Sequence, residues 1–581
     1  MGTTTSGRLS VDVAAHTFLN SLLRGMPDCA RFVSAPAGGV GEVVIAIDGD
    51  QEIRVPVSYF SPTQHHRFSF PAWRVTEWGR EPVDFAAMVD LIVATVLRRQ
   101  GAPEATGETF RHRVLQSHAH THQAIEARHH DWATLREAQF SFARAEQALL
   151  VGHAFHPAPR SHEPFTPGEA RRYLPDFAAH FPLRWFLVDR ELVAGESLGI
   201  RLPQRLRRFV AENAPQLAQA AGDERWLFPL HPWQADHLLR QAWCRRLRDD
   251  GRIVDLGEAG ASWLPTTSCR SLYCATSPEM IKFSLSVRLT NSLRTMSTKE
   301  VERGIRLARL ARTSRWQEFQ ARFPTFRVMQ EDCWAGLRDQ DGILREESLF
   351  ALRANLLHGR AGTQTNVLAT LTQNAPDGGD SLLAAVVKRL ATRLLLDPRQ
   401  AAHVWLRDYC ELVLTPLFVA EADHGLVLLA HQQNLLVEME NDLPVGAIYR
   451  DCQGSAFTAQ AADWLREIGD TEVENTLTPE QVRRYLPYYL LVNSTFAVTA
   501  ALASAGLASE RELLRRVRRF LETLRDTVTR RACLDHVLDS PHWEVKSNFL
   551  CYLLDRDENT IADPAVIYRD VANPLLGVEE P

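Results

Sequence analysis

The chain has 581 residues, of which 45% are hydrophobic and 23% are charged, a balance typical of a soluble globular protein with two or three domains. This composition excludes a mainly disordered chain, a collagen-like chain and a small scaffold held by disulfides. The formal net charge is −6, so no overall basic character favours nucleic acid or anionic lipid, and any anion must be bound by a local basic cluster.

The beginning of the chain predicts strands followed by a long helix. Residues 43–47 and 53–59 alternate around Asp48-Gly49, a dipeptide suited to a two-residue turn, and indicate a β-hairpin. Residues 109–150 contain no proline and predict a long helical stretch. Prolines then recur between positions 157 and 182 and indicate a loop-rich entry to a second region.

The rest of the chain mixes helices with short strands. Residues 374–380 form the clearest linker, and residues 381–395 after it have a helical period. We therefore predict an α+β (mixed α/β) fold in three parts, at residues 1–150, 151–373 and 381–581.

The cysteines and the apolar segments indicate a cytoplasmic protein that does not enter a membrane. The nine cysteines are odd in number and show no CxxC spacing, so we expect reduced thiols. The N-terminus lacks the pattern of a secretory signal. Residues 485–509 carry no charge and are long enough to span a bilayer, but they include Pro487, Asn493 and several hydroxyl residues. We interpret them as a buried helix.

A basic cluster surrounds residues 281–290, where apolar and polar residues alternate as on a strand. Arg270, Lys282, Arg288 and Arg294 face one acid here, and a polar turn containing Ser268 precedes them. Cations and hydroxyls together satisfy the oxygens of phosphate or carboxylate, so the cluster indicates a polyanion site. A solvated strand face is the alternative, and the pattern alone slightly favours it. Residues 297–300 then have the form of a capping box that opens a helix through residue 312.

A second polar cluster begins at His431 and ends at Asn434, between two apolar runs. A predicted hairpin turn at residues 441–442 leads from it to Arg450 and Asp451. An acid and an amide can ligate Mg²⁺ through oxygen, so His431, Asn434 and Asp451 are candidates for one site. A hydrogen-bonded hairpin with a surface Arg450–Asp451 pair is the alternative, which the residues alone favour slightly.

Histidines form the third cluster. His153 and His156 lie beside prolines in a rigid polar loop suited to phosphate. Zinc is an open alternative there and at His118, His120 and His122, because His118 and His122 lie one helical turn apart. No cysteine or carboxylate completes a recognisable spacing, so we favour hydrogen-bonding roles. The chain has no glycine-rich phosphate loop, dinucleotide fingerprint or nucleophile elbow, so a nucleotide would require a less common fold.

Six motifs in order resemble the siderophore synthetases that work without a peptide-synthetase template, the aerobactin-synthetase (IucA/IucC) family. They are GHAFHPAPR (152–160), FPLHPWQ (228–234), LPTTSCRSL (264–272), IKFSLSVRLTNSLR (281–294), LLAHQQN (428–434) and YRDCQG (449–454). The resemblance covers nearly the whole chain, and YFSPTQHHRF (59–68) is similar to members that act on N6-acetyl-N6-hydroxylysine. It implies a cupped-hand fold with thumb, fingers and palm regions, and a homodimer or higher homo-oligomer.

The resemblance also implies an ATP-dependent ligase of hydroxamate siderophore biosynthesis. ATP would activate a carboxylate of citrate as an acyl-adenylate with release of pyrophosphate. The α-amine of N6-acetyl-N6-hydroxylysine would then displace AMP and form an amide. Alternatives are a family member that uses another amine, an alcohol or a citryl monoamide, and, from a different class, a non-enzymatic binder of citrate or ferric siderophore.

Matching of the motifs implies a role for each site residue. Lys282, Arg294 and His431 would be catalytic; Ser268, Arg270 and Lys282 would contact the ATP phosphates, with His153, His156 and Arg160 beside them; Arg294, His431, Gln433, Thr290 and Lys546 would bind citrate; and Asn434 and Asp451 would serve the nucleotide and its Mg²⁺. Two positions depart from the family: Arg160 stands where lysine is common, and Leu429 stands where many members have glutamate.

Overall fold

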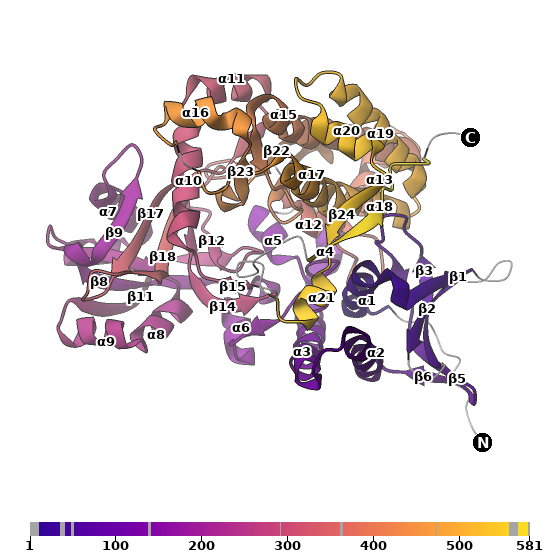
Figure 1. Cartoon of the computed structure of the whole chain (residues 1–581). Helices are drawn as coiled ribbons and strands as arrows, with labels where there is room; N and C mark the ends of the chain where they lie inside the picture. Colours follow the sequence, from indigo (N-terminus) through magenta and orange to yellow (C-terminus); the bar gives the residue numbers. More distant parts are fainter. Residues whose placement is uncertain are drawn as a thin grey trace.

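The computed structural model describes residues 11–34, 41–47, 51–137, 141–290, 292–360, 364–471, 473–556 and 567–578. Helices and strands are interleaved along these residues, which confirms the mixed α+β class (Figure 1).

A six-stranded antiparallel sheet forms the N-terminal part of the fold, in the order β1-β2-β3-β5-β6 with β4 paired to β3. Its strands are β1 (Ala30–Val33), β2 (Gly41–Ile47), β3 (Gln51–Tyr59), β4 (Arg67–Phe68), β5 (Ala72–Thr76) and β6 (Gly79–Val83). Strands β2 and β3 confirm the predicted hairpin, whose Asp48-Gly49 turn lies outside the described residues. Helices α1 (Val13–Gly25) and α2 (Phe85–Gln100) bury their apolar side chains against this sheet.

The single long helical stretch predicted for residues 109–150 is wrong in detail. Three helices occupy it: α3 (Glu104–Ala127), α4 (His129–Glu137) and α5 (Phe142–Gln147). Arg128 leaves the helical conformation (φ −114°, ψ 10°) because its guanidinium bonds Asp131 and the carbonyls of Gln147 and Asp176. These tertiary contacts break a segment that contains no proline.

An eight-stranded antiparallel sheet forms the middle of the chain, in the order β10-β8-β11-β12-β13-β18-β17-β9. Its strands are β8 (Phe181–Asp189), β9 (Val193–Ser197), β10 (Arg225–Leu230), β11 (Ile253–Pro265), β12 (Ser271–Tyr273), β13 (Glu279–Phe283), β17 (Glu331–Arg338) and β18 (Leu344–Ala354). One core joins it to α6 (Pro167–Tyr173), α7 (Leu202–Asn213), α8 (Pro232–Leu239) and α9 (Ala242–Asp249). Helix α10 (Thr298–Leu310) packs through a separate cluster containing Trp334.

The predicted strand over residues 281–289 is two strands. Residues up to Phe283 belong to β13, whereas β14 (Leu285–Leu289) pairs with β15 (Ser292–Arg294) and β7 (His162–Glu163) in a three-stranded sheet. The break lies at Ser284, whose hydroxyl donates to Glu346 O and accepts from Met296 N. Every residue of β13 is buried, so its polar side faces protein, and the solvated-face alternative is wrong for Lys282.

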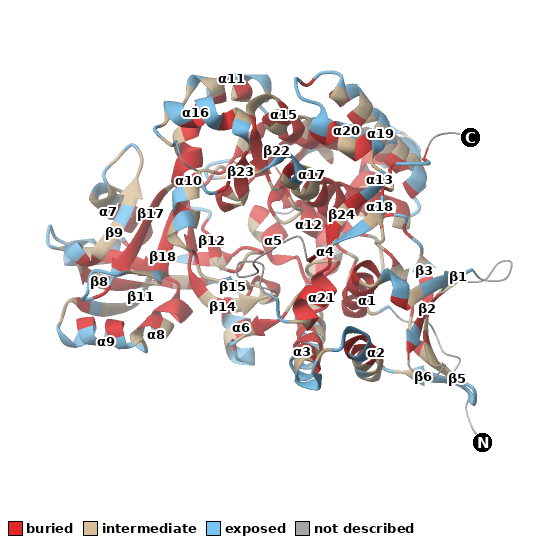
Figure 2. Cartoon of the chain, in the orientation of Figure 1, coloured by how far each residue is buried: buried red, intermediate tan, exposed pale blue. Residues whose placement is uncertain are grey.

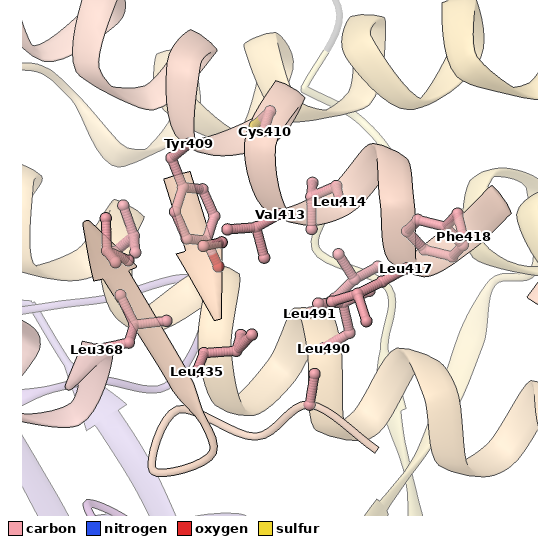
Figure 3. Close-up of a cluster of buried hydrophobic side chains, with 14 of the residues drawn as sticks. Leu368, Tyr409, Cys410, Val413, Leu414, Leu417, Phe418, Leu435, Leu490 and Leu491 are labelled. Atoms are coloured by element: carbon pink, nitrogen blue, oxygen red, sulfur yellow. The ribbon is translucent and has the colours of Figure 1, made fainter. Parts of the chain in front are cut away.

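The C-terminal part is mainly helical and contains the largest apolar core, of which Figure 3 shows one cluster. Its helices are α11 (Ser314–Arg322), α12 (Leu368–Thr372), α13 (Leu382–Leu394), α14 (Pro398–Tyr409), the π-helix η5 (Cys410–Leu414), α15 (Thr415–His424), α16 (Ala462–Glu467), α17 (Pro479–Pro487), the π-helix η8 (Tyr488–Thr495), α18 (Phe496–Ser504), α19 (Glu510–Arg525) and α20 (Ala532–Asp539). A four-stranded sheet of β16 (Phe326–Val328), β22 (Leu443–Tyr449), β21 (Leu435–Glu440) and β19 (Gln364–Val367) and the pair β20 (Leu426–Leu428) and β23 (Ser455–Phe457) pack with them. This core also takes side chains from α4 and α5, so it draws on all three predicted parts of the chain, and the division itself stays a prediction.

The uncharged segment is a buried helix, as predicted. Among the described residues, Pro479–Ser504 is the one helix long and apolar enough to cross a membrane by length and composition, and 94% of its most apolar window is buried inside the protein. Helix α18 lies within the buried interior in Figure 2, whereas α17 begins with exposed residues and α9 and α16 expose their outer faces.

Elements near the C-terminus pack against helices near the N-terminus. Strands β24 (His542–Lys546) and β25 (Tyr568–Ala572) pair, and α21 (Asn548–Leu553) packs beside α1 and α3 (Figure 1). The ring of Phe549 lies 5.6 Å from that of Phe18 and 5.2 Å from that of Phe110. Strand β24 is thereby fixed next to residues from the start of the chain.

Several local predictions are confirmed. Ser381 caps α13, and Ser297 and Glu300 form the predicted capping box of α10, which ends at Leu310 rather than at residue 312. The turn after β21 has positive φ at Asn441 (51°) and Asp442 (62°), as a primed hairpin turn requires. All nine cysteines are buried and unpaired.

Candidate active site

One cavity of about 410 Å³ is lined by every residue to which the family motifs assign a role, whereas Arg288 of the predicted basic cluster lies outside it and pairs with Asp555. The residues with an assigned role are His153, His156, Arg160, Ser268, Arg270, Lys282, Thr290, Arg294, His431, Gln433, Asn434, Asp451 and Lys546. Its volume lies in the range of small-molecule sites. These residues come from loops and from the strands β13, β15 and β24, so the fold gathers positions up to several hundred residues apart.

Lys282 lies at the centre of a buried charge network. Strand β13 carries it, and its Nζ donates to Glu331 Oε1 (3.3 Å) and Asp451 Oδ1 (3.2 Å). Arg353 also donates to Glu331, so that one carboxylate orients two cations of the cavity wall. These cations lower the pKa of Asp451 against the opposing effect of burial, so its carboxylate is ionised at neutral pH.

The turn between β11 and β12 presents Ser268 and Arg270 to the cavity. Cys269 has a positive φ of 62°, which turns the chain sharply between them. The guanidinium of Arg270 donates to the carbonyls of Arg294 and Thr295 and to Gln453 Oε1. These partners are neutral, so they orient the guanidinium without neutralising it.

The hairpin of β14 and β15 presents Thr290 and Arg294. Arg294 Nη2 donates to Leu289 O and Thr290 Oγ1, at 3.0 Å each, and its Nε is buried without a hydrogen-bond partner among the described residues. Burial, and then the charge of Arg270, lower the pKa of Arg294 to about 10. The guanidinium remains charged at neutral pH and has donor capacity left for a ligand.

The segment after β20 places His431 against Asn434 and Asp451. Asn434 Nδ2 lies 3.0 Å from both His431 Nε2 and Asp451 Oδ2, so it bridges the ring and the acid. Burial lowers the pKa of His431 to about 4, so the ring is neutral at physiological pH. The three residues therefore share one site, and the surface-pair alternative for Arg450 and Asp451 is wrong, because Arg450 is buried.

A buried ion pair, Arg450 with Glu146, holds two of these segments together. Arg450 also donates to Thr267 Oγ1 (2.8 Å) and Gln433 O (2.6 Å), and Glu146 accepts from Thr267 N (2.9 Å). We call these four residues the Arg450 clamp. It fixes the turn that carries Ser268 and Arg270 relative to the segment that carries His431 and Asn434.

The proline-rich loop brings His153, His156 and Arg160 to the same cavity. His153 and His156 each accept a backbone N–H two residues on, and burial holds the pKa of His153 well below its ordinary value. Arg160 Nη1 pairs with the buried Asp176 at 2.9 Å, which also accepts from His120, while Arg160 Nη2 has no hydrogen-bond partner within the described part of the chain. Arg160, one of the two departures noted in the sequence motifs, thus places a planar guanidinium at the cavity.

The lining carries a surplus of positive charge. It has seven Arg and Lys side chains and two carboxylates, Asp176 and Asp451. Lys282, Arg160, Arg353 and Arg450 pair with carboxylates, whereas Arg270 and Arg294 form no ion pair among the described residues. Two unneutralised guanidiniums in one cavity favour a multiply charged anion.

Sequence reasoning missed several lining residues. Asp176, Arg353 and Asn493 are isolated in the sequence, and no spacing connects them to the motifs. Tyr488 and Tyr489 come from the π-helix η8, within the segment interpreted only as a buried helix. A π-helix is frequent at functional sites, but the sequence contains no signal for it. Leu429, the other departure noted in the sequence motifs, also lines the cavity.

Comparison with known proteins identifies the family. The profile of the IucA / IucC family matches residues 141–373, and a profile described as ferric iron reductase FhuF-like transporter matches residues 403–561. The N(2)-citryl-N(6)-acetyl-N(6)-hydroxylysine synthase of Escherichia coli is 60% identical over 99% of both chains. The chain belongs to the IucA/IucC family. Another relative, the spermidine-citrate ligase of Bacillus anthracis, is 27% identical and covers 90% of this chain and 88% of its own.

A solved structure of the same family agrees with the fold of the whole chain. The ATP-bound aerobactin synthetase IucA of Klebsiella pneumoniae has a TM-score of 0.94 and 62% identity, and covers 98% of this chain and 100% of its own. This member of the IucA/IucC family is therefore an ATP-using siderophore synthetase, a ligase, which excludes the non-enzymatic binder.

Proposed function

We propose that this enzyme joins citrate to the α-amine of N6-acetyl-N6-hydroxylysine in two steps. The name of its relative from Escherichia coli, N(2)-citryl-N(6)-acetyl-N(6)-hydroxylysine synthase, supports this choice of substrates. A citrate carboxylate oxygen first attacks the α-phosphorus of ATP, the bond to pyrophosphate breaks, and citryl-adenylate forms. The amine nitrogen then attacks the acyl carbon, the bond to AMP breaks, and the amine gives up a proton as the amide forms. The observation that carries the proposal is the pair of unneutralised guanidiniums, Arg270 and Arg294, in one cavity.

The cavity suits two anions side by side. Citrate and ATP repel each other, and fixed cations offset that repulsion without reorganisation. We assign Arg294, His431, Gln433, Thr290 and Lys546 to citrate, and Ser268, Arg270, Lys282, His153, His156 and Arg160 to ATP. We assign catalysis to positioning and charge stabilisation, with Lys282, Arg294 and His431 central.

Asp451 and Asn434 are the residues that would hold Mg²⁺. Asp451 is ionised, and the amide oxygen of Asn434 accepts no hydrogen bond from described residues, so both offer the oxygen ligands that Mg²⁺ prefers. A bound Mg²⁺ would neutralise phosphate charge. We further expect a homodimer or higher homo-oligomer in the cytoplasm, which light scattering of the purified protein and cell fractionation would test.

Pyrophosphate release tests the proposal. With ATP, Mg²⁺ and citrate, release should depend on citrate, and N6-acetyl-N6-hydroxylysine should accelerate it and yield the amide, identified by mass. The Arg294→Ala variant should lose at least about a hundredfold in kcat/KM, since a charged group that contacts the reacting anion is removed. A panel of other amines, alcohols and a citryl monoamide separates the related activities. Release that is independent of citrate, or a faster reaction with another acceptor, would contradict the assignment.

A further inference from the structure

Three side chains outside the cavity converge at the beginning of α1. Asp12 Oδ2 lies 2.8 Å from His118 Nε2, His118 Nε2 lies 3.3 Å from His122 Nε2, and Asp12 Oδ1 lies 3.4 Å from His122 Nε2. In the part of the chain that the structure describes, this is the one group of three or more His, Cys, Asp or Glu residues whose ligand atoms lie close enough for one metal ion.

The spacing of these atoms matches a tetrahedral metal site. Bonds of about 2.0–2.1 Å from Zn²⁺ to nitrogen or oxygen place neighbouring ligand atoms about 3.3–3.4 Å apart. The Nε2 atoms of His118 and His122 have this separation, and the contact of His118 Nε2 with Asp12 Oδ2 has to open by about 0.5 Å to reach it. The Nε2 atoms of His118 and His122 and the carboxylate of Asp12 converge on one point. A metal cation at that point would be bound by all three side chains.

The protein holds two of the three ligands in place. Asp12 is the N-cap of α1, and its Oδ1 accepts from Ala14 N and Ala15 N at 3.1 Å each, which leaves Oδ2 available for a metal. The ring of His118 stacks on Phe85 with the ring centres 4.1 Å apart. Hydrogen bonds and packing behind the ligands are what orient them in protein metal sites.

The third ligand leaves the site open. The side chain of His122 is 49% exposed, so a solvent molecule can complete the coordination and the ion can exchange. His120, between the two ligands in sequence, points elsewhere and bonds Asp176 and His162. The carboxylate that the local sequence lacks is therefore supplied by a residue 106 positions away.

We propose that Asp12, His118 and His122 bind one divalent transition-metal ion, with Zn²⁺ preferred, and that water completes its coordination. Two imidazoles and one carboxylate suit Zn²⁺ far better than Mg²⁺ or Ca²⁺, which prefer oxygen ligands alone. The ion joins the beginning of α1 to α3 and stabilises the N-terminal part of the fold. The site lies outside the cavity, so it is independent of the proposed reaction.

Zinc titration of the tag-free, full-length enzyme, stripped with chelator, tests this proposal. Calorimetry should find one Zn²⁺ per chain more in the wild type than in the double variant His118→Ala/His122→Ala, because the cavity histidines remain in both. Zn²⁺ should raise the melting temperature of the wild type and not of the double variant. Co²⁺ should give visible absorption bands of tetrahedral intensity in the wild type alone.

Two single variants complete the test. Asp12→Asn keeps the helix cap, because asparagine also caps, yet it should weaken Zn²⁺ binding more than tenfold. His112→Ala removes an exposed histidine from α3, the helix of His118 and His122, and should leave the stoichiometry and affinity of Zn²⁺ binding unchanged. Equal Zn²⁺ stoichiometry and affinity in the wild type and the double variant, or equal losses in His112→Ala and Asp12→Asn, would overturn the proposal. Ligase activity in the double variant confirms that it folds.

Discussion

Arg160 lines the cavity from a loop, and the carboxylate of Asp176 orients its guanidinium. The carboxylate is 2% exposed, pairs with Arg160 Nη1 and accepts from His120, whose other ring nitrogen meets His162. Burial opposes ionisation of Asp176, but Arg160 and His120 outweigh it and lower the pKa of its carboxyl. Asp176 is therefore a positioning residue that acts through Arg160.

We predict that Asp176→Asn raises the KM for ATP about three- to tenfold and leaves the KM for citrate nearly unchanged. The neutral amide keeps the size of the side chain but holds the guanidinium less strongly, because it removes the negative charge that attracts Arg160 Nη1 across 2.9 Å inside the protein. Steady-state kinetics with each substrate varied in turn measure the split.

A double-variant comparison separates this role from a general loss of structure. In an Arg160→Ala background, Asp176→Asn should have little further effect on the KM for ATP, because the group it orients is gone. Fully additive effects, or an equal rise in the KM for citrate, would show that Asp176 does not act through Arg160.

At the scale of elements, the Arg450 clamp joins α5, the β11–β12 turn and the end of β22. Glu146 is 1% and Arg450 is 4% exposed, so each charge depends on the other for compensation. Because the clamp connects the Ser268–Arg270 turn with the His431–Asn434 segment, its loss disturbs both halves of the cavity.

We predict that Arg450→Met destabilises the protein by about 3–5 kcal/mol, since it leaves the carboxylate of Glu146 buried without a cation. Glu146→Gln added to it should restore much of that stability, because neither buried charge then remains. Thermal unfolding midpoints of the three proteins provide the comparison. If the double variant melts no higher than Arg450→Met, the charge of Glu146 is not the cause of the instability.

The sequence predicts the site better than it predicts the elements that carry it. The family motifs are enough to name Arg294, His431 and Asp451, whereas the residue patterns alone slightly favour a solvated strand face and a surface hairpin. The division of residues 281–289 into β13 and β14 is not predictable, because it depends on Ser284 bonding to Glu346 and Met296. The alternation of polar and apolar residues predicts a strand, but it does not reveal that both faces of β13 are buried.

Long-range partners are the other missing information. The break after α3 depends on contacts of Arg128 with residues 19 and 48 positions away. The ion pairs of Arg160 with Asp176 and of Lys282 with Glu331 likewise join residues that are distant in the sequence. Local propensity contains none of these contacts, so a single sequence cannot supply them.

At the scale of the whole molecule, the beginning and the later part of the chain meet at Glu510, the first residue of α19. Its Oε2 accepts from Tyr59 OH (2.5 Å), and its Oε1 accepts from Ser61 Oγ (3.1 Å) and Thr63 Oγ1 (2.5 Å). Burial raises the pKa of Glu510, although the three hydroxyl donors oppose the rise. The junction between the N-terminal sheet and the C-terminal helices therefore responds to pH.

The direction of this response follows from proton binding. Folded Glu510 holds its proton more tightly than the unfolded chain, in which the pKa is about 4.3, so its stabilising contribution is complete below that value and is lost as pH rises through the folded pKa. Glu510→Gln is neutral at every pH and keeps an oxygen acceptor for the hydroxyls. Its melting temperature relative to the wild type should therefore rise by about 1–2 °C between pH 4.5 and pH 7.5.

Glu512→Gln on the same helix is the matched control. Burial opposes ionisation of Glu512, but the pairing with Arg399 outweighs it and lowers the pKa of this carboxyl. The melting temperature of Glu512→Gln relative to the wild type should therefore fall over the same pH range. A constant difference for Glu510→Gln would contradict the raised pKa, and shifts of the same sign in both variants would attribute the effect to the helix as a whole.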